Sequence, residues 1–229
     1  MFEHEQSTQE RLVNFMYGVY GLMTGALTIT ALTAYVVSTI PNIETTLFAN
    51  SLFMIAIFLA QFALVIGLSW AIARLTFPTA LAMFLVFSIS IGITTSFVFL
   101  VYTKASIVQT FAITAGMFGA TTIYGYLTHA DLTKLGNVMM MAVWGLIIAL
   151  LVNLYFQSPV FDLFISAAGV LVFTALTAYD TQKIKEIGQH MMADNEMVAK
   201  IAVIGALTLY LDFVNLFLFL LRFMGRRKD

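Results

Sequence analysis

The chain has 229 residues, of which 61% are hydrophobic and only 10% are charged, and its mean hydropathy is +0.94. A soluble domain usually carries about 25% charged residues, so this composition excludes an ordinary soluble globular protein. The net charge of −1 offers no basic surface for nucleic acid, and the lack of cysteine excludes disulfides, thiol catalysis and thiolate metal sites.

Long apolar runs recur along the whole chain, and each can cross the ~30 Å hydrocarbon layer as a helix. Helices are expected because backbone groups in lipid must be hydrogen-bonded internally, and the runs are too long and too evenly apolar for barrel strands. We predict an all-α polytopic membrane protein in a single domain, residues 1–229, with a polar head at 1–14 and a basic tail at 224–229. The predicted spans are 15–40, 47–73, 78–102, 107–127, 135–156, 159–180 and 201–223.

The first span is predicted to be retained, because the residues before it include Glu3, Glu5 and Glu10 and lack the basic start of a signal peptide. Within this span, Gly21 and Gly25 form a small-residue face that favours close helix packing. After the sixth span, residues 182–199 are predicted to form the longest polar loop.

Lysine and arginine placement favours a cytoplasmic N-terminus, because short cytoplasmic segments are usually the basic ones. In this orientation the outer loops before the tail hold only Lys104, and the inner segments hold Arg11, Arg74, Lys134, Lys183, Lys185 and Lys200. Seven full spans then place the basic tail outside. Either the tail tolerates that side or the last span is re-entrant, and we predict seven full spans.

Asp212 lies near the middle of the last predicted span. A carboxylate at membrane depth costs at least ~2.5 kcal/mol on insertion scales, so it indicates function unless a partner explains it. Gly205, Thr208, Asp212 and Asn215 recur at helical spacing, and the rest of the span is mostly Leu, Phe, Val and Ile. We therefore predict that this helix is enclosed at the centre of the bundle.

Asp180 closes the preceding apolar run, so it lies on the helix next to Asp212. Two carboxylates close enough to share a proton titrate as a pair, and Arg74 ends the second span on the same predicted side. We interpret Asp180 and Asp212 as an ion pathway and pH sensor, with Arg74 as a latch. Supporting polar groups are expected from Thr177, Tyr179, Thr208, Tyr210 and Asn215.

Structural alternatives exist for each of these residues. Asp212 can pair with a hydroxyl group and hold helices together. Asp180 can be an interfacial residue neutralised by Lys183, and Arg74 can be a topology anchor that extends to the interface.

Two motifs resemble the signature of the Bax inhibitor family in its bacterial branch. They are residues 177–185 (TAYDTQKIK) and residues 205–217 (GALTLYLDFVNLF). The resemblance implies a seven-helix fold with a central last helix, and a pH-sensitive calcium leak gated by Asp180, Asp212 and a basic latch at Arg74. It also implies a multi-pass protein of the bacterial inner membrane, with Ca²⁺ as permeant ion rather than cofactor, and a membrane protease as partner.

Three function classes follow from the residues. Two carboxylates are fewer oxygens than a tight Ca²⁺ site needs, which suits a leak in which the ion leaves easily. An intramembrane aspartyl protease also pairs two aspartates, but Tyr210 and Leu211 stand where such enzymes have a Gly-x-Gly run, so we expect no enzyme. The third class is a non-catalytic partner of other membrane proteins, with the glycine faces of the first and fourth spans as contacts.

Overall fold

The computed structural model describes the backbone of residues 2–45, 49–190 and 195–228. Its helices are α1 (Phe2–Ser38), α2 (Ser51–Ala71), α3 (Phe77–Thr95), α4 (Phe97–Val101), α5 (Lys104–Leu127), α6 (Thr133–Phe156), α7 (Pro159–His190) and α8 (Asn195–Met224). Counting α3 and α4 together, 7 helical segments are long and apolar enough to cross a membrane. The prediction of an all-α, seven-span membrane protein is confirmed.

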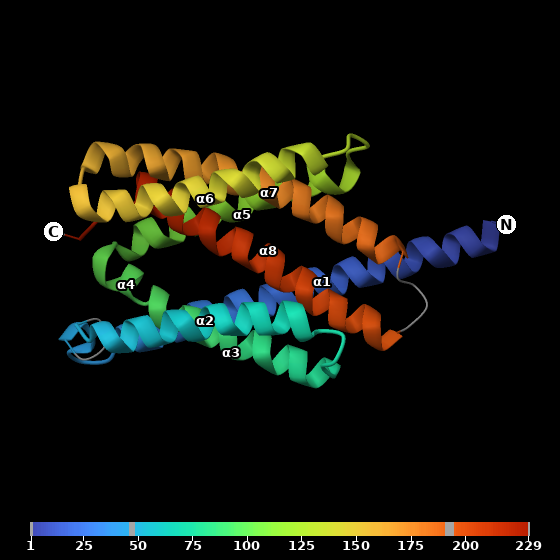
Figure 1. Cartoon of the computed structure of the whole chain (residues 1–229), viewed down its shortest axis with the longest axis horizontal. Helices are drawn as coiled ribbons and strands as arrows, with labels where there is room; N and C mark the ends of the chain where they lie inside the picture. Colours follow the sequence, from blue (N-terminus) through green and yellow to red (C-terminus); the bar gives the residue numbers. More distant parts are fainter. Residues whose placement is uncertain (1, 46–48, 191–194, 229) are drawn as a thin grey trace. The chain divides into compact units, whose positions relative to one another are not determined.

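The chain divides into two compact units (Figure 1). Unit 1 comprises Met1–Val101 and Ile187–Tyr210, and unit 2 comprises Tyr102–Glu186 and Leu211–Asp229. The end of α7 and the first half of α8 therefore belong to unit 1. That residues 1–229 form a single domain stays a prediction.

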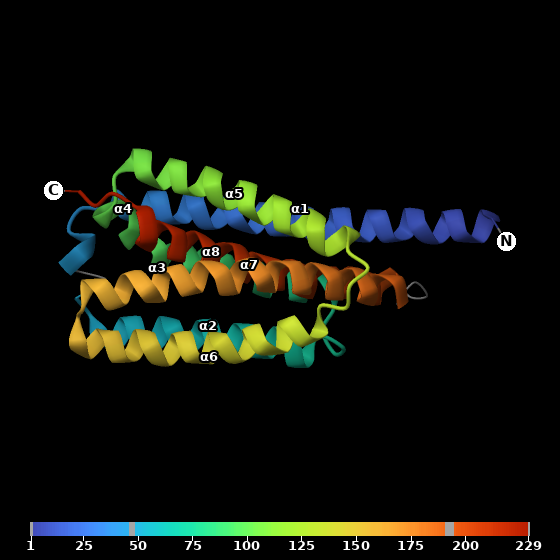
Figure 2. The same cartoon turned by 90° about the horizontal axis from the view of Figure 1, so that it is seen from above.

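In unit 1, α3 packs against both α1 and α2 (Figures 1 and 2). Gly92 permits the approach of α1, because a Cβ at this position would lie 2.6 Å from Thr33 Cβ and 2.8 Å from the Thr30 carbonyl oxygen. One helical turn away, the Thr30 hydroxyl donates to the Ser88 carbonyl at 2.9 Å and lies 2.6 Å from the Tyr210 hydroxyl. These contacts join α1, α3 and α8 within unit 1.

In unit 2, glycines mark the closest approaches between helices, and α6 runs beside α7 (Figure 2). A Cβ at Gly125 on α5 would collide with the backbone of Ala178 on α7. A Cβ at Gly136 on α6 would lie 2.5 Å from the Tyr179 ring. Because these two glycines have no side chain, α5 and α6 can pack closely against the part of α7 that carries Asp180.

The predicted polar loop at 182–199 is wrong, because α7 continues to His190 and α8 begins at Asn195. Helical burial continues past Asp180 at Thr181, Gln182, Ile184 and Gly188, which accounts for the longer helix. Asp180 is therefore inside a helix rather than at its end. Residues 191–194 lie outside the described part of the chain.

Other boundaries differ less from the predicted spans. The polar head is helical from Phe2, and α2 begins at Ser51 after Asn50, whose side chain accepts a hydrogen bond from the Phe53 amide at 3.1 Å. The predicted start of that span at residue 47 lies outside the described residues. The third span is interrupted at Ser96, because the hydroxyls of Thr95 and Ser96 bond to carbonyls one turn back, at 2.7 Å each. Such bonds bend helices.

The basic tail lies against the start of α5 within unit 2. The Thr103 amide donates to the Arg226 carbonyl at 3.1 Å, and the Arg226 amide donates to the Ser106 hydroxyl at 2.8 Å. Four full crossings, from α5 to α8, bring the tail back to the end where α5 begins. A re-entrant last span would leave it at the other end, so the contacts favour the predicted full crossing.

The last helix is the most buried of the membrane spans. In its most apolar window 61% of residues are buried, against 11–39% for the other six. Leu209, Tyr210 and Leu216 are each 0% exposed. The helix is therefore well buried, and its central place in the bundle stays a prediction.

Candidate functional site: a buried carboxyl pair

Asp180 and Asp212 lie in unit 2 on α7 and α8, and their side chains are brought together. Asp180 is 8% exposed and Asp212 is 5% exposed. Their carboxyl groups are close enough to influence each other. Ionised carboxylates only accept hydrogen bonds, so a hydrogen bond between the two groups would require a proton on one of them. The two aspartates therefore form a candidate proton-sharing pair within unit 2.

One carboxyl oxygen of Asp212, Oδ2, is buried without a hydrogen-bond partner in the described chain, and the same holds for Thr181 Oγ1. A buried polar atom without a partner costs about 1–3 kcal/mol, and more when it is charged. Within unit 2 and over the described residues, neither aspartate forms an ion pair with a base. The charge of Lys183 nevertheless acts on Asp180, so the structural alternative in which this lysine neutralises it stays open.

Lys183, the base proposed to neutralise Asp180, also holds its ammonium over the Tyr179 ring, 5.6 Å from the ring centre. That ring packs on Gly136 of α6. Tyr179 thus closes the α6 side of the site by packing, and its predicted role as a polar support gains no contact to either aspartate.

The remaining predicted supports satisfy their hydrogen bonds on their own helices. Thr177, Thr208 and Asn215 donate to carbonyls four residues back, at 2.7, 3.1 and 2.8 Å. Tyr210 belongs to unit 1, where Thr30 binds its hydroxyl and Phe84 and Phe87 meet its ring edge-on. These side chains leave the carboxyl pair without hydroxyl or amide donors.

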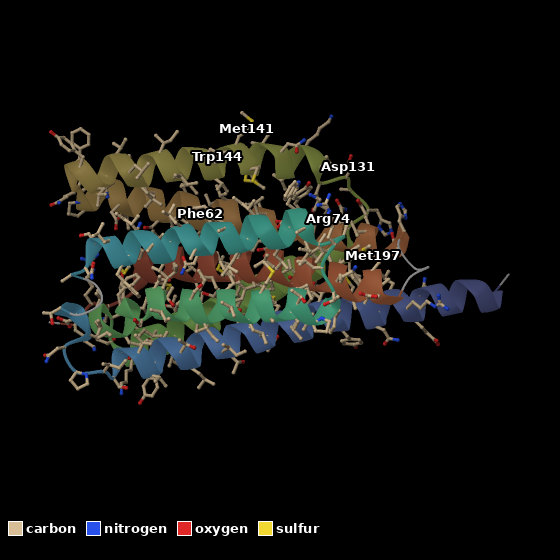
Figure 3. All side chains as sticks on the ribbon, turned by 60° about the horizontal axis from the view of Figure 1, so that its bottom comes forward. Phe62, Arg74, Asp131, Met141, Trp144 and Met197 are labelled. Atoms are coloured by element: carbon tan, nitrogen blue, oxygen red, sulfur yellow. The ribbon has the colours of Figure 1, made fainter. Side chains whose placement is uncertain are left out.

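Arg74, the predicted latch, is exposed in the turn after α2 in unit 1 (Figure 3). That turn is held against α8 by buried Lys200, whose Nζ donates to the Leu75 carbonyl at 3.1 Å. The carboxyl pair belongs to unit 2, so the latch stays a prediction.

Gln182 is a feature of the site that sequence reasoning missed, because it was assigned to a loop. Its side chain is 8% exposed and holds the α5–α6 connection from both sides. Gln182 Nε2 donates to the Ala130 carbonyl at 2.8 Å, and the Leu132 amide donates to Gln182 Oε1 at 2.9 Å. The spacing of Tyr179, Gln182 and Lys185, at every third residue, is a sequence pattern that indicates a helix continuing past Asp180.

Lys185 adds a second tie between α7 and the end of α5. Its Nζ donates to the Tyr126 carbonyl at 2.8 Å and lies 4.8 Å from the centre of the Tyr126 ring. In the same connection, hydrogen bonds from the side chain and the backbone of Thr133 lower the pKa of Asp131. The connection beside Asp180 is therefore anchored to the helix that carries it.

A second polar cluster lies at the first turn of α7, which contains Asp162. Arg222 of α8 lies 3.5 Å from Asp162 Oδ1, which also accepts a hydrogen bond from Asn153 at 3.5 Å. Between this cluster and the carboxyl pair, Phe173 of α7 stacks on Phe219 of α8 with ring centres 5.7 Å apart. Gly169 makes room for the Phe219 ring. Polar groups on these helices are thus separated by an aromatic pair.

No group of three or more His, Cys, Asp or Glu side chains in the described chain is arranged to hold a metal ion. Two carboxyl groups supply too few oxygens for a tight Ca²⁺ site, which takes 6–8. The chemistry available at the pair is proton sharing and weak attraction of a cation.

A family model described as "Inhibitor of apoptosis-promoting Bax1" matches residues 12–229, nearly the whole chain. The chain belongs to the Bax inhibitor family. The resemblance carried by the two C-terminal motifs is confirmed.

Relatives in this family align over their full lengths or nearly so. A Borreliella burgdorferi protein is 45% identical over 231 aligned residues, covering 100% of both chains. The Escherichia coli inner membrane protein YbhL is 44% identical over 218 residues, covering 95% of this chain and 93% of YbhL. A Rickettsia prowazekii protein is 38% identical, covering 96% and 92%. This Bax inhibitor family member is an integral, multi-pass membrane protein.

Proposed function

We propose that this Bax inhibitor family protein is a pH-sensitive leak channel for Ca²⁺, with Asp180 and Asp212 as ion pathway and proton sensor. The observation that carries the proposal is the burial of two neighbouring carboxyl groups, Asp180 on α7 and Asp212 on α8. Ionisable groups inside a membrane protein are expensive and usually mark ion or proton pathways. The family and the inner membrane location of YbhL support a bacterial inner membrane protein. The proposed cytoplasmic N-terminus rests on the placement of lysine and arginine in the sequence.

The pair suits conduction better than storage. Conduction requires an ion to bind strongly enough to enter and weakly enough to leave. Two neighbouring carboxyl groups attract a cation but supply too few oxygens to retain it. Each proton bound removes a negative charge from the pathway, so proton binding changes how strongly the pair attracts a cation.

Gating is assigned to two elements of different chemistry. The Phe173–Phe219 stack closes the route along α7 and α8 by an apolar constriction, and such constrictions exclude water and ions. Arg74 is proposed to hold the closed state by pairing with Asp180 from the cytoplasmic side.

The interaction-protein alternative is favoured by one observation. A Cβ added at Gly18, Gly21 and Gly25 on α1, or at Gly116 and Gly119 on α5, meets nothing within 4 Å in the described chain. Gly21 and Gly25 therefore make no close helix contact within the described chain. These faces remain available to a membrane partner such as a protease, whose membrane helix would bring its own small residues.

We do not propose an enzyme. Tyr210 and Leu211 precede Asp212, and Tyr210 is fully buried at 0% exposure. A substrate backbone approaches catalytic aspartates where glycines leave space, and the residues directly before Asp212 are not glycines.

The test is Ca²⁺ flux into proteoliposomes that contain only this protein, scanned over pH. The proposal expects flux above protein-free liposomes, with a rate that changes with pH. Arg74→Ala should raise the basal rate, since the closed state loses a partner, while Lys134→Ala serves as a control that removes another exposed basic residue. Absence of flux from folded protein at every pH would move the interaction role to first place.

A further inference from the structure

Lys200 of α8 is buried in unit 1 in a way that its ion pair does not explain. The residue is 6% exposed, and lysine is almost never fully buried unless it is paired. Its ammonium lies 3.9 Å from a carboxyl oxygen of Glu196, whose side chain is 62% exposed, and ion pairs with an exposed partner contribute little. A lysine that extends to water would have an exposed head, whereas this side chain is 8% exposed. Another contact must therefore hold the amine.

The short contact of Lys200 is to the backbone of the turn between α2 and α3. Its Nζ donates to the Leu75 carbonyl at 3.1 Å. A hydrogen bond from a charged donor is roughly twice as strong as one between neutral groups. The bond joins α8 to the turn that carries Arg74, which Figure 3 labels.

The C-terminal end of α2 is a favourable place for this cation. The carbonyl end of a helix carries partial negative charge, and α2 has no basic residue in its own last turn. The amides of Arg74 and Leu75 both donate to the Ala71 carbonyl, at 2.8 and 3.1 Å, so the chain winds on around the end of the helix. Lys200 thus supplies from α8 the positive charge that the last turn of α2 lacks.

Side-chain packing contributes little to the position of this turn. Leu68 near the end of α2 is 1% exposed and Ala80 of α3 is 0% exposed. Between them, none of residues 69–79, all of which the structure describes, is buried. The turn is therefore held through its backbone, and the bond from Lys200 is made to the residue next to Arg74.

We propose that Lys200 is a positioning residue, whose ammonium holds the α2–α3 turn against α8 and thereby sets the place of the Arg74 side chain. Its role in gating rests on the proposed function, in which Arg74 holds the closed state. Lys200 acts on Arg74 through the Leu75 peptide group and is not itself the latch. The contact that carries the proposal lies wholly within unit 1.

The first test is hydrogen exchange of the α2–α3 turn in the full-length protein in detergent, followed by mass spectrometry. Lys200→Met keeps an unbranched side chain but removes the donor, so the amides of Arg74 and Leu75 should exchange roughly tenfold faster. Lys134→Met, the same substitution at an exposed lysine of α6, is the matched control and should leave these amides unchanged. Lys200→Leu, which also lacks a donor, replaces Lys200→Met if that variant does not fold.

The second test is basal Ca²⁺ leak in proteoliposomes at fixed pH. Lys200→Met should raise the leak, but by no more than Arg74→Ala does, because it displaces the latch and does not remove it. The double variant should leak at the rate of Arg74→Ala alone, since residues that act through one another are not additive. A lysine that only stabilised the fold, or that repelled cations by its own charge, would add its effect to that of Arg74→Ala.

Unchanged exchange of the turn in Lys200→Met would overturn the proposal, because the turn would then be held without the lysine. Faster exchange with a wild-type leak, or an additive double variant, would overturn the action of Lys200 through Arg74. If the folded wild type shows no Ca²⁺ leak, the proposed function fails and the gating role fails with it. The exchange comparison then decides by itself whether Lys200 holds the turn.

Discussion

Asp212 lies close to Asp180, and one of its carboxyl oxygens, Oδ2, is buried without a partner in the described chain. This arrangement is expensive in an apolar bundle, and a group that served only to join helices would have both oxygens satisfied. Residue type and position alone were enough to select Asp212 as a candidate functional residue, because few structural roles account for a carboxylate inside an apolar run. Its pairing with Asp180 followed from their places on consecutive helices.

Gly125 shows a residue-scale constraint on the same site. Gly125→Ala should destabilise the protein by about 1–3 kcal/mol, because its methyl group would collide with the backbone of Ala178, which cannot rotate away. Thermal unfolding in detergent measures the change. Gly119→Ala on the same helix is the control and should be neutral or slightly stabilising, since a Cβ there meets nothing within 4 Å. Equal midpoints for both variants would contradict the close α5–α7 contact.

Gln182 leads to a prediction about the connection beside the site. Gln182→Ala removes the acceptor of the Leu132 amide and the donor to Ala130. One hydrogen bond contributes roughly 1 kcal/mol, so exchange of the Leu132 amide should become about fivefold faster. Hydrogen exchange followed by mass spectrometry resolves this segment. Gln189→Ala, exposed on the same helix, should leave it unchanged, and unaltered protection in Gln182→Ala would show that the clamp does not hold the connection.

At the scale of elements, the apolar runs predicted which segments are helices but not how far they extend. Hydropathy marks only the part of a helix that meets lipid, so the polar turns of α7 from Gln182 to His190 were read as loop. Their helical burial pattern comes from contacts with distant segments, such as Gly188 against Phe15. Likewise, the break at Ser96 depends on which carbonyls the hydroxyls reach, and composition does not specify this.

The aromatic stack between α7 and α8 is the element-scale test of gating. Phe219→Ala should raise basal Ca²⁺ leak several-fold, because it removes one ring of the stack with Phe173. Phe118→Ala is a matched loss of a buried ring in unit 2, since Phe118 packs edge-on against Phe213 away from the stack. Proteoliposome flux at fixed pH compares the two. The same rise in both variants would indicate general loosening rather than an opened constriction.

At the scale of the whole molecule, the topology follows from contacts inside unit 2. The tail meets residues 103–106 through backbone and side-chain hydrogen bonds, which favours a full last span over a re-entrant one. Counting lysine and arginine cannot assign the tail to one side of the membrane. Its own bases favour the cytoplasmic side, whereas seven spans from a cytoplasmic N-terminus place it outside. The lack of cysteine makes this testable with single introduced cysteines.

A membrane-impermeant maleimide should label Lys228→Cys on intact bacterial cells and label His129→Cys only after the membrane is opened. The reason is that four crossings place the tail with the start of α5 and the His129 connection at the opposite end. Gln9→Cys should behave as His129→Cys does if the N-terminus is cytoplasmic. Labelling of Lys228→Cys and His129→Cys from one side would contradict seven full spans.

The central claim is that the buried carboxyl pair senses protons and attracts the permeant cation. Its most direct test is Ca²⁺ flux in proteoliposomes as a function of pH for wild type and Asp212→Asn, with Glu186→Gln as the control for an exposed acid on α7. Asn keeps the shape and hydrogen bonding but loses the charge, so Asp212→Asn should lower the flux and flatten its pH dependence. A shift of one pKa unit corresponds to about tenfold in the open-to-closed ratio if proton binding is fully coupled to gating. Glu186→Gln should keep the wild-type profile. Folded, reconstituted Asp212→Asn protein that leaks Ca²⁺ at the wild-type rate, with the wild-type pH profile, would contradict the account.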